Sequence, residues 1–182
     1  MLSIKYSNNS CQLLTLLSIM DRMEQTVIYL ETGSASLPTN ATYLALCQQV
    51  RRSVFVKEQG VSEAIDFDGK DGLCAHLLLP FGDDAVGTLR IRTTEKGTKL
   101  ERISIIREYR KQGLGELLVR CALSLVSGPL YIHAQVRSMG FYERLGFIVQ
   151  DLTIFFEADI PHTTMIWPHG QGEQPCYITR PS

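Results

Sequence analysis

One short stretch decides the fold that this sequence predicts: Arg110-Lys111-Gln112-Gly113-Leu114-Gly115. It lies between an apolar strand, expected over 99–106, and an amphipathic helix, expected over 113–126. Free N–H groups at a helix N-terminus, with glycines that let a ligand approach the backbone, are typical of a site for phosphate oxygens. Arg110 and Lys111 add positive charge to the same loop. The stretch therefore indicates a phosphate-binding loop.

Two other phosphate loops do not match this stretch. A Walker A loop continues with Gly-Lys-Ser/Thr, whereas Gly115 is followed by Glu116 and Leu117. The dinucleotide fingerprint needs a third glycine at position 118, where this chain has Leu118. From the hexapeptide alone, a surface turn whose glycines serve only the backbone is the structural alternative.

The surrounding pattern predicts one mixed α/β domain. The helix after the loop has an apolar face at i, i+3, i+4, i+7 spacing: Leu114, Leu117, Leu118, Cys121, Ala122 and Leu125. Further strands are expected over 27–31, 73–79, 85–93, 130–134, 147–157 and 163–167, and further helices over 41–55 and 136–145. Residues 58–71, with two glycines and five acidic side chains, indicate a loop. No repeat or linker interrupts this order.

The domain is expected to cover residues 23–168. Residues 1–22 are interpreted as an N-terminal extension of doubtful role, because their apolar run over 11–20 is too short to span a bilayer and lacks an A-x-A cleavage site. Residues 169–182 lack periodicity and are expected to form a C-terminal tail.

Composition narrows the class of protein. The chain has 182 residues, a hydrophobic content of 45% and a net charge of −1, which is typical of a globular domain. The charge predicts no general attraction to nucleic acid or to an anionic membrane. Five cysteines without a CxxC pair favour free thiols in a reducing compartment, so we expect a cytoplasmic protein.

No metal site is expected. The run Asp66-x-Asp68-x-Lys70-Asp71 begins like a calcium loop, but a lysine and an aspartate replace a ligand and the required glycine. The four histidines lack metal-binding spacing such as HExxH.

The order of motifs resembles the GNAT-type N-acetyltransferase superfamily. The loop follows Leu100-Glu101-Arg102-Ile103-Ser104-Ile105 and precedes a second motif, Phe141-Tyr142-Glu143-Arg144-Leu145-Gly146-Phe147. The stretches around Glu58-Gln59-Gly60-Val61, His133-Ala134-Gln135 and Ile160-Pro161-His162 are similar to the bacterial YjcF-like branch. The resemblance spans about residues 27–165. It implies an α/β fold of the α+β kind, with a mixed, mostly antiparallel central sheet of about six to seven strands flanked by about four helices.

The resemblance also implies acetyl-CoA as acyl donor. Strand residues would pair their backbone with the pantetheine arm, the loop amides would hold the pyrophosphate with an arginine lending charge, and a glutamine would contact the cofactor arm. The residues implied to bind the cofactor are Ile103, Ser104, Ile105, Arg110, Lys111, Gln112, Gly113, Leu114, Gly115 and Gln135.

Two catalytic roles are expected. Tyr142 matches the family tyrosine whose hydroxyl can protonate the departing thiolate, although a packed aromatic beside Phe141 and Phe147 is the structural alternative. The attacking amine must be neutral, which requires a base or a water chain. Glu101 is the candidate base, with Glu58 and His76 as rivals.

Three functions stay open on the sequence. The first is direct transfer of an acetyl group to a primary amine of a small molecule or a protein. The others are a non-catalytic acyl-CoA-binding or sensing module, and an acyl-homoserine-lactone-type synthase, which the run Arg51-x-x-Val54-Phe55 resembles. The acidic 58–71 segment suits a cationic amine and equally a solvated surface. A homodimer through the C-terminal strands is plausible for this scaffold.

Overall fold

The computed structural model describes residues 26–33, 38–81, 84–175 and 177–181, so the expected N-terminal extension lies outside it. The strands are β1 (Thr26–Leu30), β2 (Ala75–Phe81), β3 (Asp84–Thr94), β4 (Gly97–Ile105), β5 (Leu130–Gln135), β6 (Ile148–Val149), β7 (Phe155–Glu157), β8 (Ile160–Trp167) and β9 (Tyr177–Thr179). The α-helices are α2 (Pro38–Arg51), α3 (Glu63–Asp66), α4 (Leu114–Leu125) and α5 (Met139–Leu145), and a π-helix over Arg52–Glu58 continues α2.

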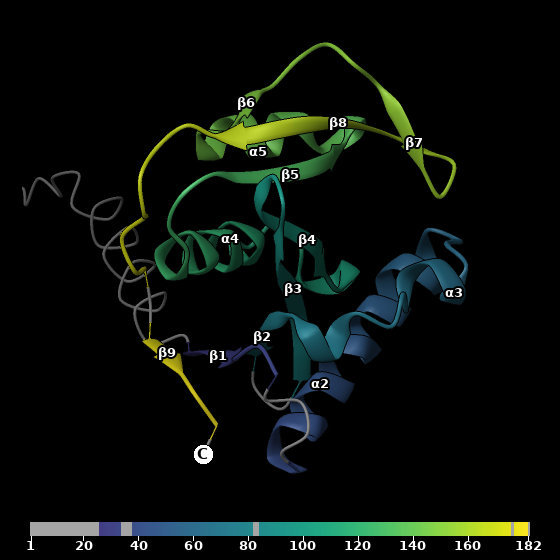
Figure 1. Ribbon diagram of the computed structural model, residues 1–182. Coiled ribbons are helices and arrows are strands. Elements are labelled where there is room, and N and C mark those ends of the chain that lie inside the picture. Colours follow the sequence, from purple (N-terminus) through teal and green to yellow (C-terminus); the bar gives the residue numbers. More distant parts are fainter. Residues whose placement is uncertain (1–25, 34–37, 82–83, 176, 182) are drawn as a thin grey trace, which may run out of the picture.

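All nine of these strands join one sheet (Figure 1). Its order is β6-β8-β5-β4-β3-β2-β1-β9, with β7 also paired to β8. Only β4–β5 and β1–β9 are parallel, so the mixed, mostly antiparallel sheet is confirmed. Four α-helices in the described chain agree with the expected number, but the sheet exceeds the expected six to seven strands.

Two regions account for the extra strands. The single strand expected over 147–157 is two short strands, β6 and β7, because β7 forms a hairpin with β8 through Ala158 and Asp159 at positive φ values of 50° and 60°. The expected tail contains β9, which pairs with β1 at the far end of the sheet. Within that tail the Gly172 amide also donates to the Leu123 carbonyl over 3.0 Å, so this segment packs on α4.

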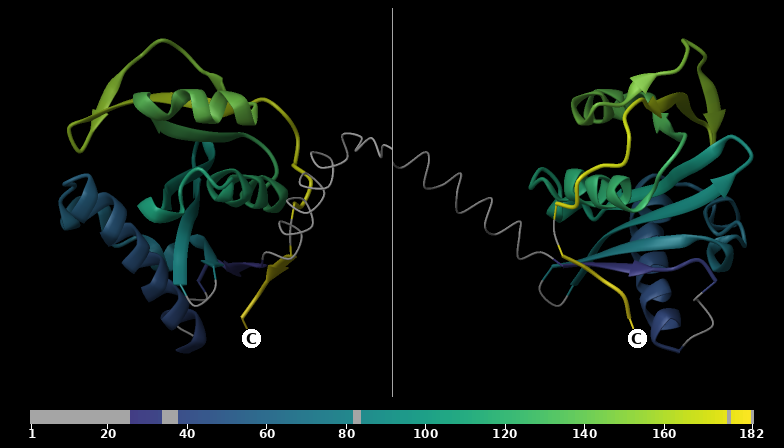
Figure 2. Two further views of the ribbon diagram at one scale, coloured as in Figure 1. Left: turned by 180° about the vertical axis from the view of Figure 1, so that it is seen from behind. Right: turned by 60° about the vertical axis from the view of Figure 1, so that its left-hand side comes forward.

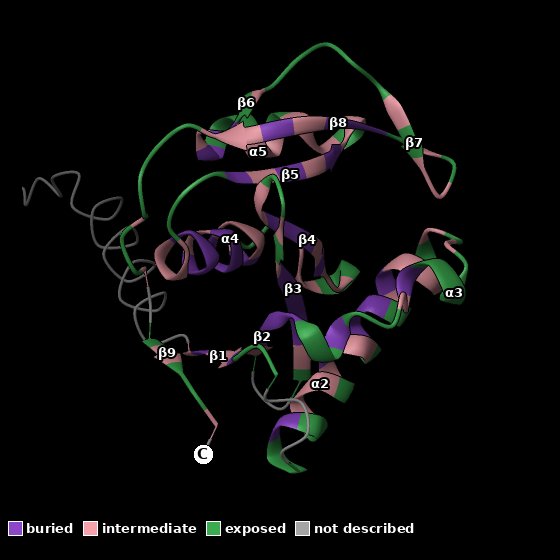
Figure 3. Cartoon of the chain, viewed as in Figure 1, coloured by how far each residue is buried: buried purple, intermediate pink, exposed green. Residues whose placement is uncertain are grey.

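Helices cover both faces of the central strands (Figures 2 and 3). Leu77 and Leu79 of β2 lie in one apolar cluster with the buried face of α4, whereas Leu78 lies in a second cluster with Cys47 of α2. Since successive side chains of a strand point to opposite faces, α4 and α2 lie on opposite sides of the sheet. The apolar face predicted for α4 is buried, with Leu125 partly so.

The sheet opens between β4 and β5. Their parallel ladder covers only Thr98–Leu100 and Leu130–Ile132. On its other edge β4 carries one extra residue, since Thr88 faces Ser104 while Arg90 faces Glu101. Arg102 lies in this bulge with φ 56°. A β-bulge bends its strand, and here the rest of β4 diverges from β5.

The described residues also show the state of three cysteines and the length of the helices. Cys47, Cys74 and Cys121 are buried free thiols, and burial raises the pKa of Cys47 to about 12. No helix in the described ranges is long and apolar enough to cross a membrane.

Candidate active site

Two cavities meet where β4 leaves β5. The larger, of about 770 Å³, lies between the π-helix segment, β4, β5 and β8, and the smaller, of about 470 Å³, lies beside the start of α4 and α5. Six residues line both cavities: Ile103, Ser104, Ile105, Arg110, Ser138 and Tyr142. A ligand in the smaller cavity therefore reaches the larger one past the end of β4 and the tyrosine.

The predicted phosphate loop forms the wall of the smaller cavity. Lys111, Gly113 and Gly115 line it, and Gly113 takes φ 81° at the N-cap of α4. The first bond within the helix runs from the Leu117 amide to the Gly113 carbonyl over 3.0 Å, so the earlier amides lack helical partners and remain available to an anion.

Two predicted loop residues contribute no side chain to this cavity. The Leu114 side chain is buried in the core. The Gln112 side chain hydrogen-bonds the Glu108 carbonyl. Any contact that these two residues make with a phosphate is therefore through the backbone.

Arg110 is not a free cation in this structure. Its Nη1 and Nη2 form a two-pronged ion pair with the Glu58 carboxylate at 2.7 and 2.6 Å, and its Nε donates to the Ile105 carbonyl at 2.9 Å. The pair ties the phosphate loop to the π-helix. The hydrogen bond from Arg110 lowers the pKa of Glu58, which makes Glu58 a weak proton acceptor.

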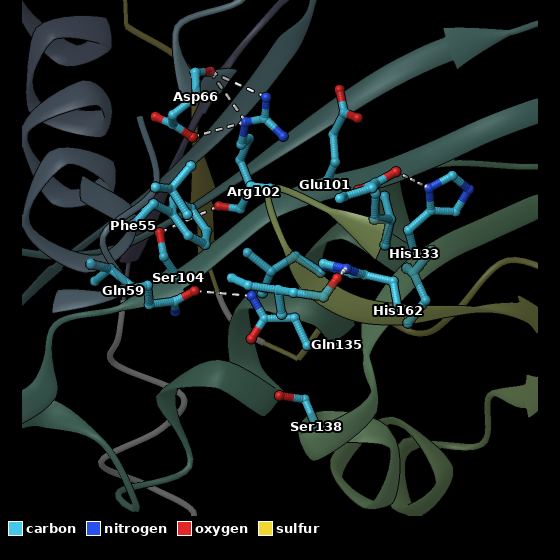
Figure 4. A pocket seen from close by; sticks show the side chains of 18 of the residues that line it. Phe55, Gln59, Asp66, Glu101, Arg102, Ser104, His133, Gln135, Ser138 and His162 are labelled. Carbon is cyan, nitrogen blue, oxygen red and sulfur yellow. Dashed lines mark hydrogen bonds and ion pairs between the residues drawn. The ribbon is translucent and has the colours of Figure 1, made fainter. Parts of the chain in front are cut away.

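Gln135 lies at the end of β5 inside the larger cavity (Figure 4). Its Nε2 donates to Gln59 Oε1 over 3.0 Å, and its Oε1 accepts from Arg137 Nε over 2.8 Å. The side chain is thereby held across the opening between the sheet and the π-helix segment. It lines the larger cavity and not the smaller one.

Tyr142 occupies the junction of the two cavities. Its ring stands edge-on to Phe141 and Phe147, at centroid distances of 4.9 and 5.8 Å. The aromatic packing and the cavity position therefore coexist. Burial raises the pKa of the Tyr142 hydroxyl, so it carries its proton at neutral pH, as an acid must.

The expected base Glu101 is held in ion pairs. Its carboxylate contacts Arg90 at 2.8 Å, Arg92 at 2.7 Å and Lys99 at 3.6 Å, and its side chain is 7% exposed. Burial alone would raise the pKa of Glu101, but the hydrogen bond from Arg92 and the nearby cations lower it. Glu101 lines the larger cavity, yet this environment opposes proton uptake.

The rival His76 lies outside both cavities. It is buried in β2, and its Nε2 hydrogen-bonds the Asp71 carbonyl at 2.9 Å. Burial lowers its pKa. His76 is therefore not placed to accept a proton from a ligand in either cavity.

The acidic 58–71 segment is not an open cation site, because each of its five carboxylates is paired with an arginine. Glu58 and Glu63 are exposed, whereas Asp66 and Asp71 are buried. Asp66 binds Arg51 at 3.0 Å and Arg102 at 2.9 Å. Asp68 and Asp71 each bind Arg90 at 2.7 Å. Glu58 and Glu63 bind Arg110 and Arg52. This arginine–carboxylate network fastens the segment to the sheet as one wall of the larger cavity.

The cavity residues that the sequence analysis did not assign to the site include two histidines and a glutamate. His133, Glu157 and His162 line the larger cavity at its β5, β7 and β8 side. His133 Nδ1 lies 2.6 Å from Glu157 Oε1 and 2.9 Å from Lys99 Nζ. Strand alternation could have indicated His133, because it shares a face with Gln135. His162 and Glu157 depend on the β7–β8 hairpin, which the apolar pattern did not resolve.

The comparison with known families agrees with this fold. A family model described as acetyltransferase (GNAT) domain matches residues 47–168. The chain therefore belongs to the GNAT acetyltransferase family, whose general chemistry is acyl transfer from an acyl-CoA.

Two relatives from Bacillus subtilis (strain 168) are similar in sequence. The protein YyaT is 39% identical over 124 residues, which cover 64% of this chain and 83% of YyaT. The N-acetyltransferase YjcF is 31% identical over 121 residues, which cover 64% of this chain and 86% of YjcF. This agrees with the resemblance to the YjcF-like branch.

Solved structures share the fold. Escherichia coli ElaA superposes with a TM-score of 0.66 at 28% identity, covering 77% of this chain and 97% of ElaA. An acyl-CoA N-acyltransferase from Pseudomonas aeruginosa gives 0.64 at 27% identity, covering 77% and 98%. The acyl-homoserine lactone synthase BjaI gives 0.63 at 12% identity, covering 87% and 94%, which shows a common fold alone.

Proposed function

We propose that this protein transfers an acetyl group directly from acetyl-CoA to a primary amine. One observation carries the proposal: the smaller and the larger cavity share a boundary, which is made of the end of β4 and Tyr142. A donor and an acceptor held on the two sides of that boundary would meet at one point, which lowers the entropy cost of reaction.

The donor is assigned to the smaller cavity. The pyrophosphate of CoA would lie on the unpartnered amides of the loop, and the pantetheine arm would add to the exposed edge of β4. The strand edge is available because the β4–β5 ladder ends at Leu100 and Ile132. The thioester would then reach Ile103–Ile105 beside Tyr142.

The acceptor is assigned to the larger cavity. Attack of the amine forms a C–N bond, and collapse of the oxyanion breaks the C–S bond. Tyr142 would give its proton to the departing sulfur, because its raised pKa keeps the hydroxyl protonated. The paired carboxylates of the 58–71 segment carry little unbalanced negative charge, so this wall does not favour polycations over other amines.

The test has two parts. Isothermal titration should give a saturable signal for acetyl-CoA, and its absence at millimolar cofactor would refute the proposal. A thiol-release screen should then find CoA release with one class among polyamines, amino sugars, aminoglycosides, peptide lysines and peptide N-termini. Binding without release across the panel would support a sensing module instead. Release that requires S-adenosylmethionine would support a lactone synthase.

A further inference from the structure

We propose that His162 is the general base of this site and that its Nε2 takes the proton from the attacking amine. The inference rests on the proposed function and adds a catalytic residue to it. Its basis is the geometry of the β7–β8 hairpin.

The imidazole of His162 is fixed in one tautomer. Its Nδ1 lies 2.7 Å from the Ile160 carbonyl, and a carbonyl oxygen only accepts hydrogen bonds, so Nδ1 carries the proton. The hydrogen bonds found among the described residues leave Nε2 without a partner. Phe155 stacks on the ring with an interplanar angle of 21° and a centroid distance of 6.1 Å, which restricts its rotation.

The position of this ring matches the place of reaction. His162 is the ladder partner of Gln135, so the two side chains stand next to each other on the same face of the sheet. Both line the larger cavity, and Figure 4 shows them close together among its lining residues. Since Nδ1 is held by the backbone, Nε2 is the nitrogen available to an amine beside Gln135.

The other cavity groups are less suited to this role. Glu58 and Glu101 are ion-paired carboxylates with lowered pKa values. Glu157 is paired with His133, and although burial alone would raise its pKa, that hydrogen bond and Lys99 lower it to about 2. His133 Nδ1 either donates to the ionised Glu157 carboxylate or accepts from Lys99 Nζ, so this ring is already engaged with the charged groups of β4 and β7.

One carboxylate lies close to the His162 ring. Glu157 of β7 interacts electrostatically with it across the hairpin. The other charged or titratable groups around this end of the cavity include His133 of β5, Lys99 and Glu101 of β4, and Arg92 of β3. An imidazolium formed during the reaction therefore lies beside an ionised carboxylate.

Every proton that moves in the proposed reaction is accounted for. The amine nitrogen forms its bond to the thioester carbon, and its proton passes to Nε2 of His162. The C–S bond breaks, and the sulfur takes the proton of Tyr142. Return of the proton from His162 to the tyrosinate through solvent restores both groups, and the products are the amide and the CoA thiol.

A spectroscopic test needs no acceptor. Two-bond ¹H–¹⁵N correlation spectra of the ring nitrogens should include a histidine signal with a protonated Nδ1 and a bare Nε2 that vanishes in His162→Gln. The chain has only four histidines, so the assignment is tractable. A protonated Nε2 and bare Nδ1 in neutral His162 would overturn the inference.

A kinetic test uses the amine found by the thiol-release screen. His162→Gln should lower kcat/KM by about 10²–10⁴-fold, which is the usual contribution of a general base. It should remove the rise of kcat/KM with pH on the acidic side while leaving the acetyl-CoA dissociation constant within about twofold. His169→Gln is the matched control, because His169 packs on Trp167 outside both cavities and should keep the wild-type profile.

The kinetic results distinguish the assignment of His162 as base from the proposed acetyltransferase function. If the wild type turns over and His162→Gln keeps both its rate and its acidic limb, the base assignment falls and the proposed function stands. If the wild type binds no acetyl-CoA or releases no thiol with any amine, both fall.

Discussion

Tyr142 is the residue on which the proposed chemistry is easiest to test. Tyr142→Phe removes the hydroxyl but keeps the edge-on packing against Phe141 and Phe147. We expect kcat to fall by about 10²-fold, the low end for a lost general acid, with acetyl-CoA affinity unchanged. Steady-state rates and isothermal titration measure the two effects.

The raised pKa of Tyr142 also predicts how the wild-type rate depends on pH. An acid is active while protonated, and this pKa lies above the ordinary tyrosine value of about 10. The wild-type rate should therefore show no loss from tyrosine ionisation below about pH 10. An unchanged kcat in Tyr142→Phe would leave the residue with a packing role only.

Gly113 offers a second test at the residue scale, and the chain supplies a matched control. Gly113 and Gly128 have nearly the same positive φ, 81° and 85°, but of these two only Gly113 lines the smaller cavity. Replacing either by alanine should cost about 1–2 kcal/mol of stability, because an L-residue is strained there. Denaturant titration measures this cost.

The two glycine variants should differ in cofactor binding. Gly113→Ala shifts the backbone that presents the α4 amides, so we expect acetyl-CoA to bind about tenfold more weakly, a change of about 1.4 kcal/mol. Gly128→Ala should bind like the wild type, since nothing lies within 4 Å of its added Cβ. Equal affinities for the two variants would contradict the assignment of the phosphate loop.

At the element scale, the arginine–carboxylate network holds the 58–71 segment on β3 and β4. Arg90 is buried and bridges Asp68, Asp71 and Glu101 at 2.7–2.8 Å. Arg90→Met leaves these carboxylates without their buried partner, and we expect a loss of about 3–5 kcal/mol in the free energy of unfolding. Arg52→Ala, which breaks the exposed pair with Glu63 and the contact with the Phe67 ring, should cost much less stability. Similar losses would show that the network is not a stabilising element.

The same network predicts acid sensitivity. Burial alone would raise the pKa of Asp68, Asp71 and Glu101, but the arginines lower each pKa below its unfolded value. Their stabilisation is complete above the unfolded carboxyl pKa of about 4 and is lost as pH falls through the folded values. Thermal melts from pH 7 to 3 should show the melting temperature fall below about pH 4, and less so in Arg90→Met. A melting temperature that stays constant down to pH 3 would exclude this linkage.

At the scale of the whole molecule, the last strand is separated from the site. β9 pairs with β1 at one end of the sheet, while both cavities lie beyond β4 on the other side. Removal of residues 176–182 deletes the partly buried Ile178. We expect a loss of about 1 kcal/mol, or a melting temperature about 2–4 °C lower, with acetyl-CoA affinity unchanged. Ile178→Ala in the full chain is the control for the side chain alone, and weakened cofactor binding would show that β9 supports the site.

Local patterns were sufficient for several elements. The α4 periodicity, the apolar β2 and the glycines before α4 correctly predicted a helix, a buried strand and a glycine loop at the helix start, because each depends on residues close together in the sequence. The β7–β8 hairpin was missed, since its turn at Ala158 and Asp159 has positive φ without glycine or asparagine. The β9 strand was missed because three residues are too few to show alternation.

The sequence by itself therefore determined the family, the mixed sheet and the place of the glycine loop before α4. Only the tertiary structure decided how the charged side chains are used. Glu101 was expected as a base from its position before Ile103, yet Arg90 and Arg92 from the neighbouring strand bind it. His162 stands beside Gln135 through ladder pairing between β5 and β8. Ion pairing and proton transfer depend on distances between residues far apart along the chain, and those distances exist only after the sheet has formed.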